Sequence, residues 1–366
     1  MKMKKRHIAY YVTAHGYGHG VRSCDVIGAL LAAHPGMKIT VTTDLPEGFL
    51  RSRLPQGDGR LVVRPGAFDV GMVQKDSIRV DVDATLDEAL ELVAEREKLI
   101  DYEAEMLRGE SADLVVADIP SIPIEAAVEA GVPAVAVGNF SWDWIYAPFA
   151  VRDPRWRSVV RTFEEGYRQA KLLLKLPFSP AMSVFPKRVE LPLLAKPGRA
   201  RRKELAARTG ADEAKRWVLL SFTSLDWDAA ALREVESLGD FEFFTVKPLA
   251  WNGLANVHAV DRQAIGFSDV LASCDAVVTK PGYGILSDCV ANAKPIVYAE
   301  REDFIEYPLL ERELKRYLKN IHLPAADLYA GRLGAALEAV ETAPAPRETL
   351  PGGGAEKAAE ILMGLA

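Results

Sequence analysis

Short runs of apolar residues alternate with longer amphipathic stretches along both halves of the chain. The runs are rich in Val, Ile and Ala and are apolar at consecutive positions, which is typical of parallel strands buried between two layers of helices. They predict strands at residues 7–13, 38–43, 61–63, 113–117 and 134–138, and again at 217–222, 242–246, 257–260, 276–279 and 295–299.

Apolar residues spaced three and four positions apart predict amphipathic helices between these strands. Residues 22–34 carry Val26, Leu30 and Leu31 at this spacing, and residues 83–107 repeat it over a longer stretch. The other predicted helices lie at residues 121–130, 228–237, 268–274, 284–292, 307–318 and 356–365. Because strands and helices alternate in both halves, the predicted fold class is α/β, with two Rossmann-like, doubly wound parallel sheets.

The segment between the two halves has the composition of a linker. Residues 191–202 contain two prolines, a glycine and a cluster of basic residues, and such a stretch favours a hinge. A chain of 366 residues is long enough for two hydrophobic cores. We therefore expect one domain at residues 1–192 and a second at residues 200–350, facing a cleft, with the closing helix in residues 355–366 packing back on the first.

Composition and charge exclude several classes of function. A formal net charge of −6 gives no electrostatic support for nucleic-acid binding. The three cysteines, Cys24, Cys274 and Cys289, lack metal-ligand spacing, and an odd, small number indicates reduced thiols in a cytoplasmic protein. No run of about 18 apolar residues occurs, so we expect no transmembrane segment. The basic residues 1–6 precede an apolar stretch that is too short for a signal peptide. They could touch an anionic membrane surface, but a solvated terminus is the simpler interpretation.

Each half contains a glycine-rich motif directly after a predicted strand. Residues 15–20 read His-Gly-Tyr-Gly-His-Gly, and residues 280–284 read Lys-Pro-Gly-Tyr-Gly. A junction of strand and helix presents backbone N–H groups and the positive end of a helix dipole, while glycine lets a ligand approach closely. Only the first motif carries histidines, which predicts different tasks for the two.

The first motif does not match a dinucleotide-binding fingerprint. Gly16, Gly18 and Gly20 alternate and residue 21 is Val, whereas the fingerprint is G-x-G-x-x-G. Asp44 nevertheless follows the second strand, where an NAD ribose partner would lie, so a dehydrogenase stays an alternative. The chain has no Walker A pattern and neither H-E-x-x-H nor C-x-x-C, which weakens the kinase and metalloenzyme interpretations.

His15 and His19 are the first candidates for chemistry. We expect the glycines to keep both in a loop, and the simpler interpretation is that they cap the helix or hydrogen-bond the backbone. Asp118 follows the strand predicted at 113–117 and should point into the same crevice. Its carboxylate could hold a histidine Nδ1–H and leave Nε2 as a base. The alternative for Asp118 is an N-cap on the helix that starts near Ser121.

Two further clusters allow both a structural and a functional interpretation. Asp226, Trp227 and Asp228 spell D-x-D, the pattern of metal-dependent sugar transferases, but they lie at a predicted helix start and we favour an N-cap without metal. Residues 139–146 place Trp142 and other large aromatics after a strand. Aromatic faces suit sugar rings or hydrophobic acceptors, and core packing explains each of them equally well.

Several motifs together give the chain a family resemblance. They lie at residues 11–19, 139–143, 280–284, 301–308 and 352–362. On these motifs the whole chain resembles the nucleotide-sugar glycosyltransferases of the GT-B fold, and in particular the glycosyltransferase-like N-terminal half of L-arabinokinase. The galactokinase-type domain of arabinokinase has no counterpart in the sequence, so the resemblance implies the transferase fold without sugar kinase activity.

The resemblance implies an acceptor side in the first half. Gly18 and His19 are similar to the Gly-His pair of plant UDP-sugar glycosyltransferases and of the peptidoglycan N-acetylglucosaminyltransferase. In the plant enzymes this histidine deprotonates the acceptor, and an aspartate from a later strand end, comparable to Asp118, orients it. The residues expected to bind the acceptor are His15, Gly18, Asn139 and Trp142.

The resemblance implies a donor side in the second half, where the second glycine motif is similar to the donor diphosphate loop. Lys280 stands where the plant enzymes keep a histidine near the phosphates, Asp288 where a ribose-binding glutamate is usual, and Glu306 near a glutamine that holds donor sugar hydroxyls. The departures at positions 288 and 306 leave the donor sugar open, and the UDP-sugar that the resemblance implies is only a default. The residues expected to bind the donor are Thr223, Ser224, Lys280, Gly282, Tyr283, Gly284, Asp288, Glu302 and Glu306.

The sequence therefore predicts a metal-independent, inverting glycosyltransferase that needs no cofactor besides its nucleotide diphosphate sugar. Lys280 and the loop N–H groups would stabilise the leaving diphosphate in place of a divalent ion. His19 would take the proton of an acceptor hydroxyl on a small molecule, a glycan or a lipid. A nucleotide-sugar epimerase or hydrolase, and a non-catalytic module that binds sugar nucleotides, stay open as alternatives.

Overall fold

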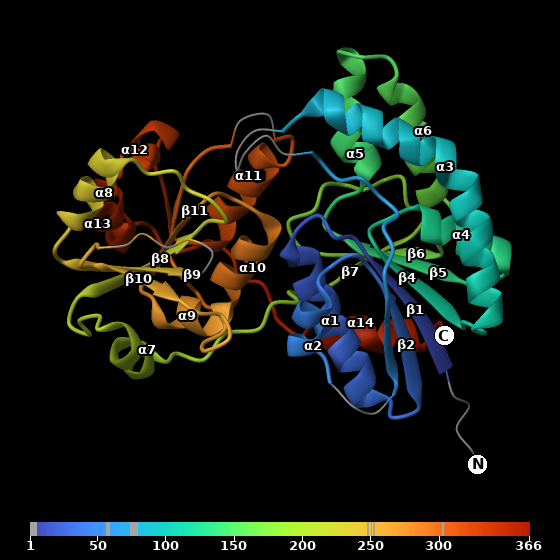
Figure 1. Cartoon of the computed structure of the whole chain (residues 1–366), viewed down its shortest axis with the longest axis horizontal. Coiled ribbons are helices and arrows are strands. Elements are labelled where there is room, and N and C mark those ends of the chain that lie inside the picture. Colours follow the sequence, from blue (N-terminus) through green and yellow to red (C-terminus); the bar gives the residue numbers. More distant parts are fainter. Residues whose placement is uncertain are drawn as a thin grey trace. The chain divides into compact units, whose positions relative to one another are not determined.

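The computed structural model of the chain describes residues 6–55, 59–73, 80–246, 249, 251, 253–301 and 304–366. These residues form two compact units (Figure 1). Unit 1 holds the described residues up to 194 together with residues 353–366, and unit 2 holds residues 195–352. Each unit is built on one parallel β-sheet with flanking helices, which confirms the predicted α/β class with two Rossmann-like sheets.

The sheet of unit 1 has the strand order β3-β2-β1-β4-β5-β6-β7, and neighbouring strands run parallel. Its strands are β1 (Arg6–Val12), β2 (Met37–Thr42), β3 (Leu61–Arg64), β4 (Leu114–Asp118), β5 (Ala134–Gly138), β6 (Leu172–Lys175) and β7 (Arg188–Glu190). The chain builds the sheet outward in both directions from β1 and β4. The carboxyl ends of these two strands therefore flank the switch point where ligands bind in doubly wound sheets.

Helices cover both faces of this sheet. They are α1 (Tyr17–Ala33), α2 (Glu47–Arg53), α3 (Val82–Gly109), α4 (Ile122–Ala130), α5 (Trp142–Tyr146), the 3-10 helix η1 (Ala147–Val151), α6 (Trp156–Tyr167) and α14 (Gly354–Met363). Alternate residues of the strands, such as Ile8, Tyr10 and Val12 of β1, share one core cluster with α1, α2 and α14. The opposite face lies under α3 and α4 (Figure 1). Burial on both faces explains why the strands are apolar at consecutive positions.

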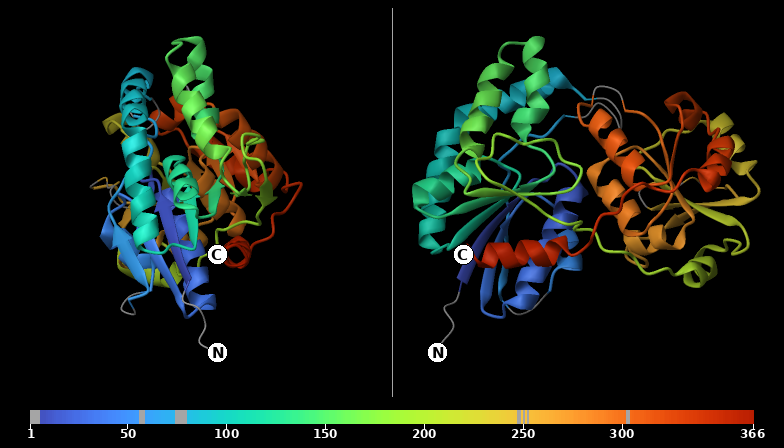
Figure 2. Two further views of the ribbon diagram at one scale, coloured as in Figure 1. Left: turned by 90° about the vertical axis from the view of Figure 1, so that its right-hand side faces the viewer. Right: turned by 180° about the vertical axis from the view of Figure 1, so that it is seen from behind.

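The last helix of the chain packs against the first helix (Figure 2). Ala358 and Leu362 of α14 are fully buried in the cluster that also holds residues of α1. Gly354 begins α14, and a Cβ at this position would lie 2.2 Å from the carbonyl oxygen of Pro192, so the backbone contact requires glycine. The Arg6 guanidinium donates to the carbonyl of Met363 at 3.0 Å. The first and the last described residues are thus parts of unit 1.

Helix α1 begins earlier than the glycines predicted. Gly16 is its N-cap residue, with φ of 113°, and Gly18, His19 and Gly20 lie inside the helix. A Cβ on Gly20 would lie 2.6 Å from side-chain carbons of both Leu45 and Phe49. The glycine at position 20 therefore serves close packing, and the prediction that a loop continues through residue 20 is wrong.

The sheet of unit 2 has the strand order β10-β9-β8-β11-β12-β13, again with parallel neighbours. Its strands are β8 (Arg216–Ser221), β9 (Phe241–Val246), β10 (Val257–Val260), β11 (Ala276–Thr279), β12 (Ile296–Tyr298) and β13 (Asn320–His322). Its helices are α7 (Arg202–Thr209), α8 (Ala229–Glu236), α9 (Phe267–Ser273), α10 (Tyr283–Ala291), α11 (Tyr307–Tyr317), α12 (Ala325–Tyr329) and α13 (Gly334–Thr342). The order reverses between β8 and β11, which makes their carboxyl ends the corresponding switch point.

Within the described ranges, no helix combines the length and the apolar composition that crossing a membrane requires.

Candidate functional site

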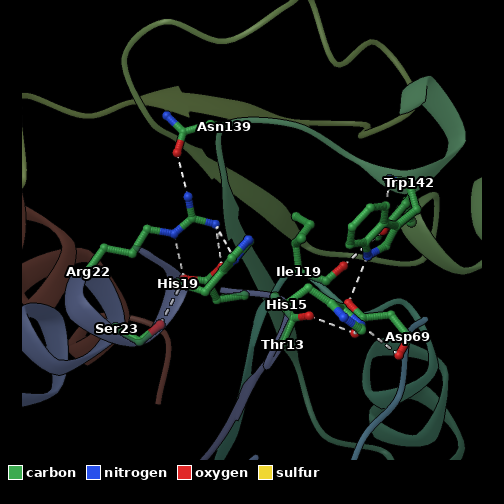
Figure 3. A network of polar contacts seen from close by, with 11 residues as sticks. Thr13, His15, His19, Arg22, Ser23, Asp69, Ile119, Asn139 and Trp142 are labelled. Carbon is green, nitrogen blue, oxygen red and sulfur yellow. Dashed lines mark hydrogen bonds and ion pairs between the residues drawn. The ribbon is translucent and has the colours of Figure 1, made fainter. Parts of the chain in front are cut away.

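Polar side chains gather at the carboxyl ends of β1, β4 and β5 in unit 1 (Figure 3). Val12, the last residue of β1, pairs in register with Asp118, the last residue of β4. The amide of Thr13 donates to the Asp118 carbonyl at 2.8 Å, which keeps the two strand ends together. The predicted candidates His19 and Asp118 are therefore brought to one place, the switch point of this sheet.

One face of α1 points three side chains at the Asp118 carboxylate. His19, Arg22 and Ser23 are spaced three and four residues apart, so they share a face of the helix. His19 Nδ1 lies 2.9 Å from Oδ1. Arg22 donates from Nε to Oδ2 at 2.8 Å and from Nη2 to Oδ1, and the Ser23 hydroxyl donates to Oδ2 at 2.8 Å.

The carboxylate of Asp118 is completely buried, and both of its oxygens are engaged by the side chains of this cluster. Helix α4 has Ser121 at its N-cap and receives no side-chain cap, so the N-cap alternative for Asp118 is wrong. Burial alone would raise the pKa of Asp118, but the charge and hydrogen bonds of Arg22, with a smaller contribution from His19, hold that pKa well below its usual range. Asp118 is an ionised carboxylate whose charge is paired.

His19 is neutral at pH 7 for two reasons. Burial lowers the pKa of His19, and the positive charge of Arg22 lowers it further, which together outweigh the attraction of Asp118. No described residue makes a hydrogen bond to Nε2 of His19. A neutral imidazole with one nitrogen engaged and the other available can accept a proton from a ligand.

Asn139 follows β5 and is tied into the same cluster. Its side-chain oxygen accepts a hydrogen bond from Nη1 of Arg22, and its amide nitrogen donates to the carbonyl of Pro177 at 2.6 Å. Both ends of the amide are thus engaged within unit 1. The contact with Arg22 links β5 to α1 and places Asn139 one side chain away from His19.

The second histidine of the motif has its own carboxylate partner, Asp69. His15 precedes α1, and its Nε2 lies 3.0 Å from the backbone carbonyl and 3.2 Å from Oδ1 of Asp69. Thr13 and Trp142 also donate to the Asp69 carboxylate, each at 2.7 Å. Burial would lower the pKa of His15, but the hydrogen bonds and charge of Asp69 outweigh burial and raise it. The interpretation of His15 as a residue that hydrogen-bonds the backbone is therefore correct in part.

Aromatic rings connect the two histidines. Trp142 begins α5 and meets the ring of His15 edge-on at a centroid distance of 6.0 Å. Phe140 lies 5.0 Å from Trp142 and 5.6 Å from His19. Trp142 and Phe140 are both buried, so packing accounts for much of their surface. Gly18 lies in the first turn of α1, and a Cβ there would meet nothing within 4 Å.

In unit 2 the second glycine motif lies at the other switch point. Lys280 follows β11, Gly282 is the N-cap residue of α10, and Tyr283 and Gly284 begin that helix. Lys280 and Ser224, which follows β8, line one depression together with Glu300 and Tyr329. The structure therefore brings the predicted donor residues Lys280 and Ser224 together. Thr223, next to Ser224, is exposed.

Two of the remaining predicted donor residues lie on α10 and at the N-terminal end of α11. Asp288 is half-buried on α10, one turn beyond the motif. Glu306 is the N-cap residue of α11, where burial raises its pKa and Arg301 opposes the rise. Glu302 lies outside the described residues.

Arg301 was not predicted, yet it lies against the donor motif. Nη1 contacts the Pro281 carbonyl at 3.4 Å, and the guanidinium lies 3.2 Å from the ring centroid of Phe304. Nε has no hydrogen-bond partner among the described residues. Burial lowers the pKa of Arg301 to about 10, with Glu306 opposing the fall. A charged guanidinium thus lies beside the loop, and no described residue accepts a hydrogen bond from its buried Nε.

The second aspartate of the D-x-D sequence caps a helix. Asp228 is the N-cap residue of α8, and its Oδ1 accepts from the amides of Ala230 and Ala231 at 2.8 Å each. Asp226 is exposed in the loop before it. The N-cap prediction is confirmed.

Sequence reasoning missed Arg22, Ser23 and Asp69. The signal for the first two was their spacing from His19, which becomes visible only when α1 is extended to include His19. Asp69 lies after the short strand β3 in an irregular segment, and no local sequence pattern indicates that it contacts His15.

Comparison with known proteins supports the resemblance seen in the motifs. The chain is 31% identical over 370 residues to L-arabinokinase of Arabidopsis thaliana, a match that covers 97% of this chain. It spans only about a third of the length of that relative (34%). No protein-family model matches the chain.

Solved structures of glycosyltransferases share the fold over nearly the whole chain. The glycosyltransferase of kitacinnamycin superimposes with a TM-score of 0.64 at 17% identity, covering 99% of this chain and 94% of that one. CalG4, the calicheamicin glycosyltransferase, gives a TM-score of 0.64 at 17% identity, with coverages of 99% and 95%. Arabidopsis thaliana UGT89C1 complexed with UDP gives 0.61 at 14% identity, covering 99% and 100%. The chain has the GT-B fold, as predicted.

Proposed function

We propose that this chain is a metal-independent, inverting glycosyltransferase that moves a sugar from a nucleoside diphosphate sugar to an acceptor hydroxyl. The observation that carries the proposal is the buried pair of His19 and Asp118 at the switch point of unit 1. A neutral histidine whose Nδ1 meets a carboxylate can use Nε2 as a general base. The relative L-arabinokinase carries the name of a sugar kinase, but the chain matches a third of it and has no Walker A loop.

The proposed reaction exchanges one bond of the anomeric carbon for another and moves one proton. The acceptor oxygen attacks the anomeric carbon from the side opposite the diphosphate, and its proton passes to Nε2 of His19. The bond from the anomeric carbon to the diphosphate oxygen breaks, and the diphosphate leaves with the electron pair. Asp118 stabilises the imidazolium that forms, as carboxylates do beside catalytic histidines.

Unit 2 is proposed to bind the donor through its diphosphate. Lys280 and Arg301 supply positive charge beside the N-terminus of α10, where backbone N–H groups and the helix dipole favour an anion. Such groups can replace a divalent cation at a leaving diphosphate. A uridine donor is our default, and a neighbour of the same fold has been solved complexed with UDP.

The test combines a thermal-shift screen of nucleoside diphosphates and their sugars with product analysis. We expect UDP or another nucleoside diphosphate to raise the melting temperature, and a transferred sugar to appear only when an acceptor from a panel of small molecules, glycans and lipids is added. Transfer should survive EDTA. His19→Ala should lower the transfer rate by about 10²–10⁴, the range of general-base help, while His34→Ala at the other end of α1 serves as the control.

Three results would contradict the proposal. Free sugar or an epimer formed from the donor alone would indicate a hydrolase or an epimerase. Loss of activity in EDTA that Mg²⁺ restores would make the enzyme metal-dependent. Full activity of His19→Ala would remove the base from the mechanism.

A further inference from the structure

Arg22 contacts His19 and two of its polar neighbours, Asp118 and Asn139, and the proposed reaction gives it no task. Its guanidinium donates to both oxygens of Asp118 and to the side-chain oxygen of Asn139 (Figure 3). Its Nη2 also lies 2.9 Å from Nδ1 of His19. Arginine keeps its proton at any ordinary pH, so a permanent donor and a permanent positive charge stand beside the imidazole.

This contact creates a competition for Nδ1 of His19. The nitrogen lies 2.9 Å from Oδ1 of Asp118, an acceptor, and 2.9 Å from Nη2 of Arg22, a donor. Nδ1 can donate to the first or accept from the second, but not both. If it accepts, the ring proton lies on Nε2, and His19 can only donate to a ligand. The tautomer therefore decides whether His19 is able to act as a base.

We propose that Arg22 is a positioning residue that holds the Asp118 carboxylate so that Oδ1 accepts the Nδ1–H of His19 and Nε2 is left to take a proton. The inference rests on the proposed function, because only a histidine that acts as a base needs this tautomer. What it predicts is the nitrogen of His19 that carries the ring proton, and this can be measured without any substrate.

The hydrogen-bond capacity of the cluster favours this tautomer. Asp118 can accept about four hydrogen bonds, and Arg22 supplies two of them and Ser23 a third. The Nδ1–H of His19 completes the set. In the other tautomer two lone pairs, on Oδ1 and on Nδ1, would face each other across 2.9 Å in a fully buried site. A buried carboxylate gains more from a fourth donor than from a facing lone pair.

The charge of Arg22 has a separate effect on the same ring. The charged groups that influence His19 are Arg22 on α1, Asp118 at the end of β4 and Asp69 after β3. Burial and Arg22 lower the pKa of His19, whereas both carboxylates raise it. Removing the charge at position 22 should therefore raise the pKa of His19. Keeping the charge but removing the planar fork should leave the ring neutral while loosening the carboxylate.

The experiment is ¹⁵N NMR of the histidine side chains of the full chain at pH 7. The chain has six histidines, and the spectrum of His19→Gln identifies the His19 signals by their loss. We expect a protonated Nδ1 and an unprotonated, pyridine-like Nε2 in the native protein. A protonated Nε2 with a bare Nδ1 would show that Arg22 donates to the ring, and would overturn the proposal without any substitution at position 22.

Substitutions then separate geometry from charge. Arg22→Lys should mix the two tautomers while His19 stays neutral, and Arg22→Gln should both mix them and shift the His19 titration to higher pH. Ser23→Ala is the matched control, because it removes a neutral donor from the same carboxylate, and it should keep the native tautomer. If Arg22→Lys and Arg22→Gln both keep the native tautomer, Arg22 does not position the ring.

The two proposals fail in different ways. A native Nδ1–H tautomer that depends on Arg22, in a protein without transferase activity, would support the positioning role and contradict the proposed function. Sugar transfer that depends on His19, in a protein whose His19 tautomer does not change when Arg22 is substituted, would support the proposed function and contradict the positioning role.

Discussion

Two histidines four residues apart in one motif have pKa values that are shifted in opposite directions by their surroundings. Nε2 of His15 contacts the backbone carbonyl and the carboxylate of Asp69. Both groups are acceptors, so Nε2 keeps its hydrogen and His15 gains or loses a proton at Nδ1. His19 meets Asp118, whose charge is already paired with Arg22. The pKa of His15 is raised and that of His19 is lowered. Pairs of titratable groups whose pKa values are pushed apart indicate a division between acid and base.

The pH dependence of transfer follows from the state of His19. Burial and Arg22 put its pKa below the ordinary 6.5, so the basic form persists to lower pH than for an exposed histidine. We expect the acid limb of the profile of kcat/KM, which reports the unbound enzyme, to lie below pH 6.5. The limb should stay in place in His15→Gln. A limb above 6.5 would assign the titration to another group.

At the scale of secondary structure, α14 shows how one glycine fixes a helix. Gly354 lies against the backbone carbonyl of Pro192 and its own amide donates to the carbonyl of Leu193 at 3.0 Å. The obstacle to a Cβ is backbone, which cannot rotate away as a side chain can. The position of α14 against α1 therefore depends on the absence of a side chain at residue 354.

Gly354→Ala should destabilise unit 1 by about 1–3 kcal/mol, the range for overpacking a well-packed contact. Gly352→Ala is the matched control, because a Cβ there would meet nothing within 4 Å. Urea unfolding of both variants, followed by Trp fluorescence and compared at equal slope, measures the difference. Equal stability of the two variants would show that the backbone around Pro192 shifts at little cost to accommodate a Cβ at residue 354.

Elements were predictable from sequence where a single pattern decided them. The strands Ala134–Gly138, Val257–Val260 and Ala276–Thr279 have their predicted bounds, because each is a short run rich in Val and Ala between polar residues or prolines. The start of α1 was not predictable, since Gly16, Gly18 and Gly20 read alike and only packing against α2 distinguishes the last.

The site was predictable in part for the same physical reason. Residues at strand ends, such as Asp118 and Lys280, could be assigned to a sheet edge from the alternation of elements alone. Arg22 depended on the true start of a helix. Asp69 and Arg301 lie in irregular segments. There the contacts between side chains depend on tertiary packing, which a periodic sequence pattern does not reveal. The region from α5 to β7 was also missed, because its aromatic residues pack on one another instead of forming a regular stripe.

For the whole molecule, each unit contains its own switch point, and the two carry different residue types. Unit 1 places histidines and carboxylates there, while unit 2 places Lys280 and Arg301 beside a helix N-terminus. This difference predicts that nucleoside diphosphate binding belongs to unit 2 alone.

Lys280→Ala should weaken binding of UDP, or of the nucleoside diphosphate selected by the screen, by about 10–100-fold. That loss corresponds to a charge-assisted hydrogen bond of about 1.5–3 kcal/mol. Lys203→Ala, an exposed lysine on α7 of the same unit, is the control, and His19→Ala in unit 1 should bind UDP as the native protein does. Calorimetry measures all three, and unchanged affinity in Lys280→Ala would move the diphosphate elsewhere.

The packing of α14 on α1 has a consequence for how the protein is made. Residues 195–352 are continuous in the chain, whereas unit 1 needs residues 353–366 to cover the core around Leu30 and Leu31. During synthesis the earlier strands and helices of unit 1 leave the ribosome first. Their core around Leu30 and Leu31 stays uncovered while unit 2 is synthesised. Domains usually fold in the order of their synthesis, but here the second unit can reach its final structure before the first is complete.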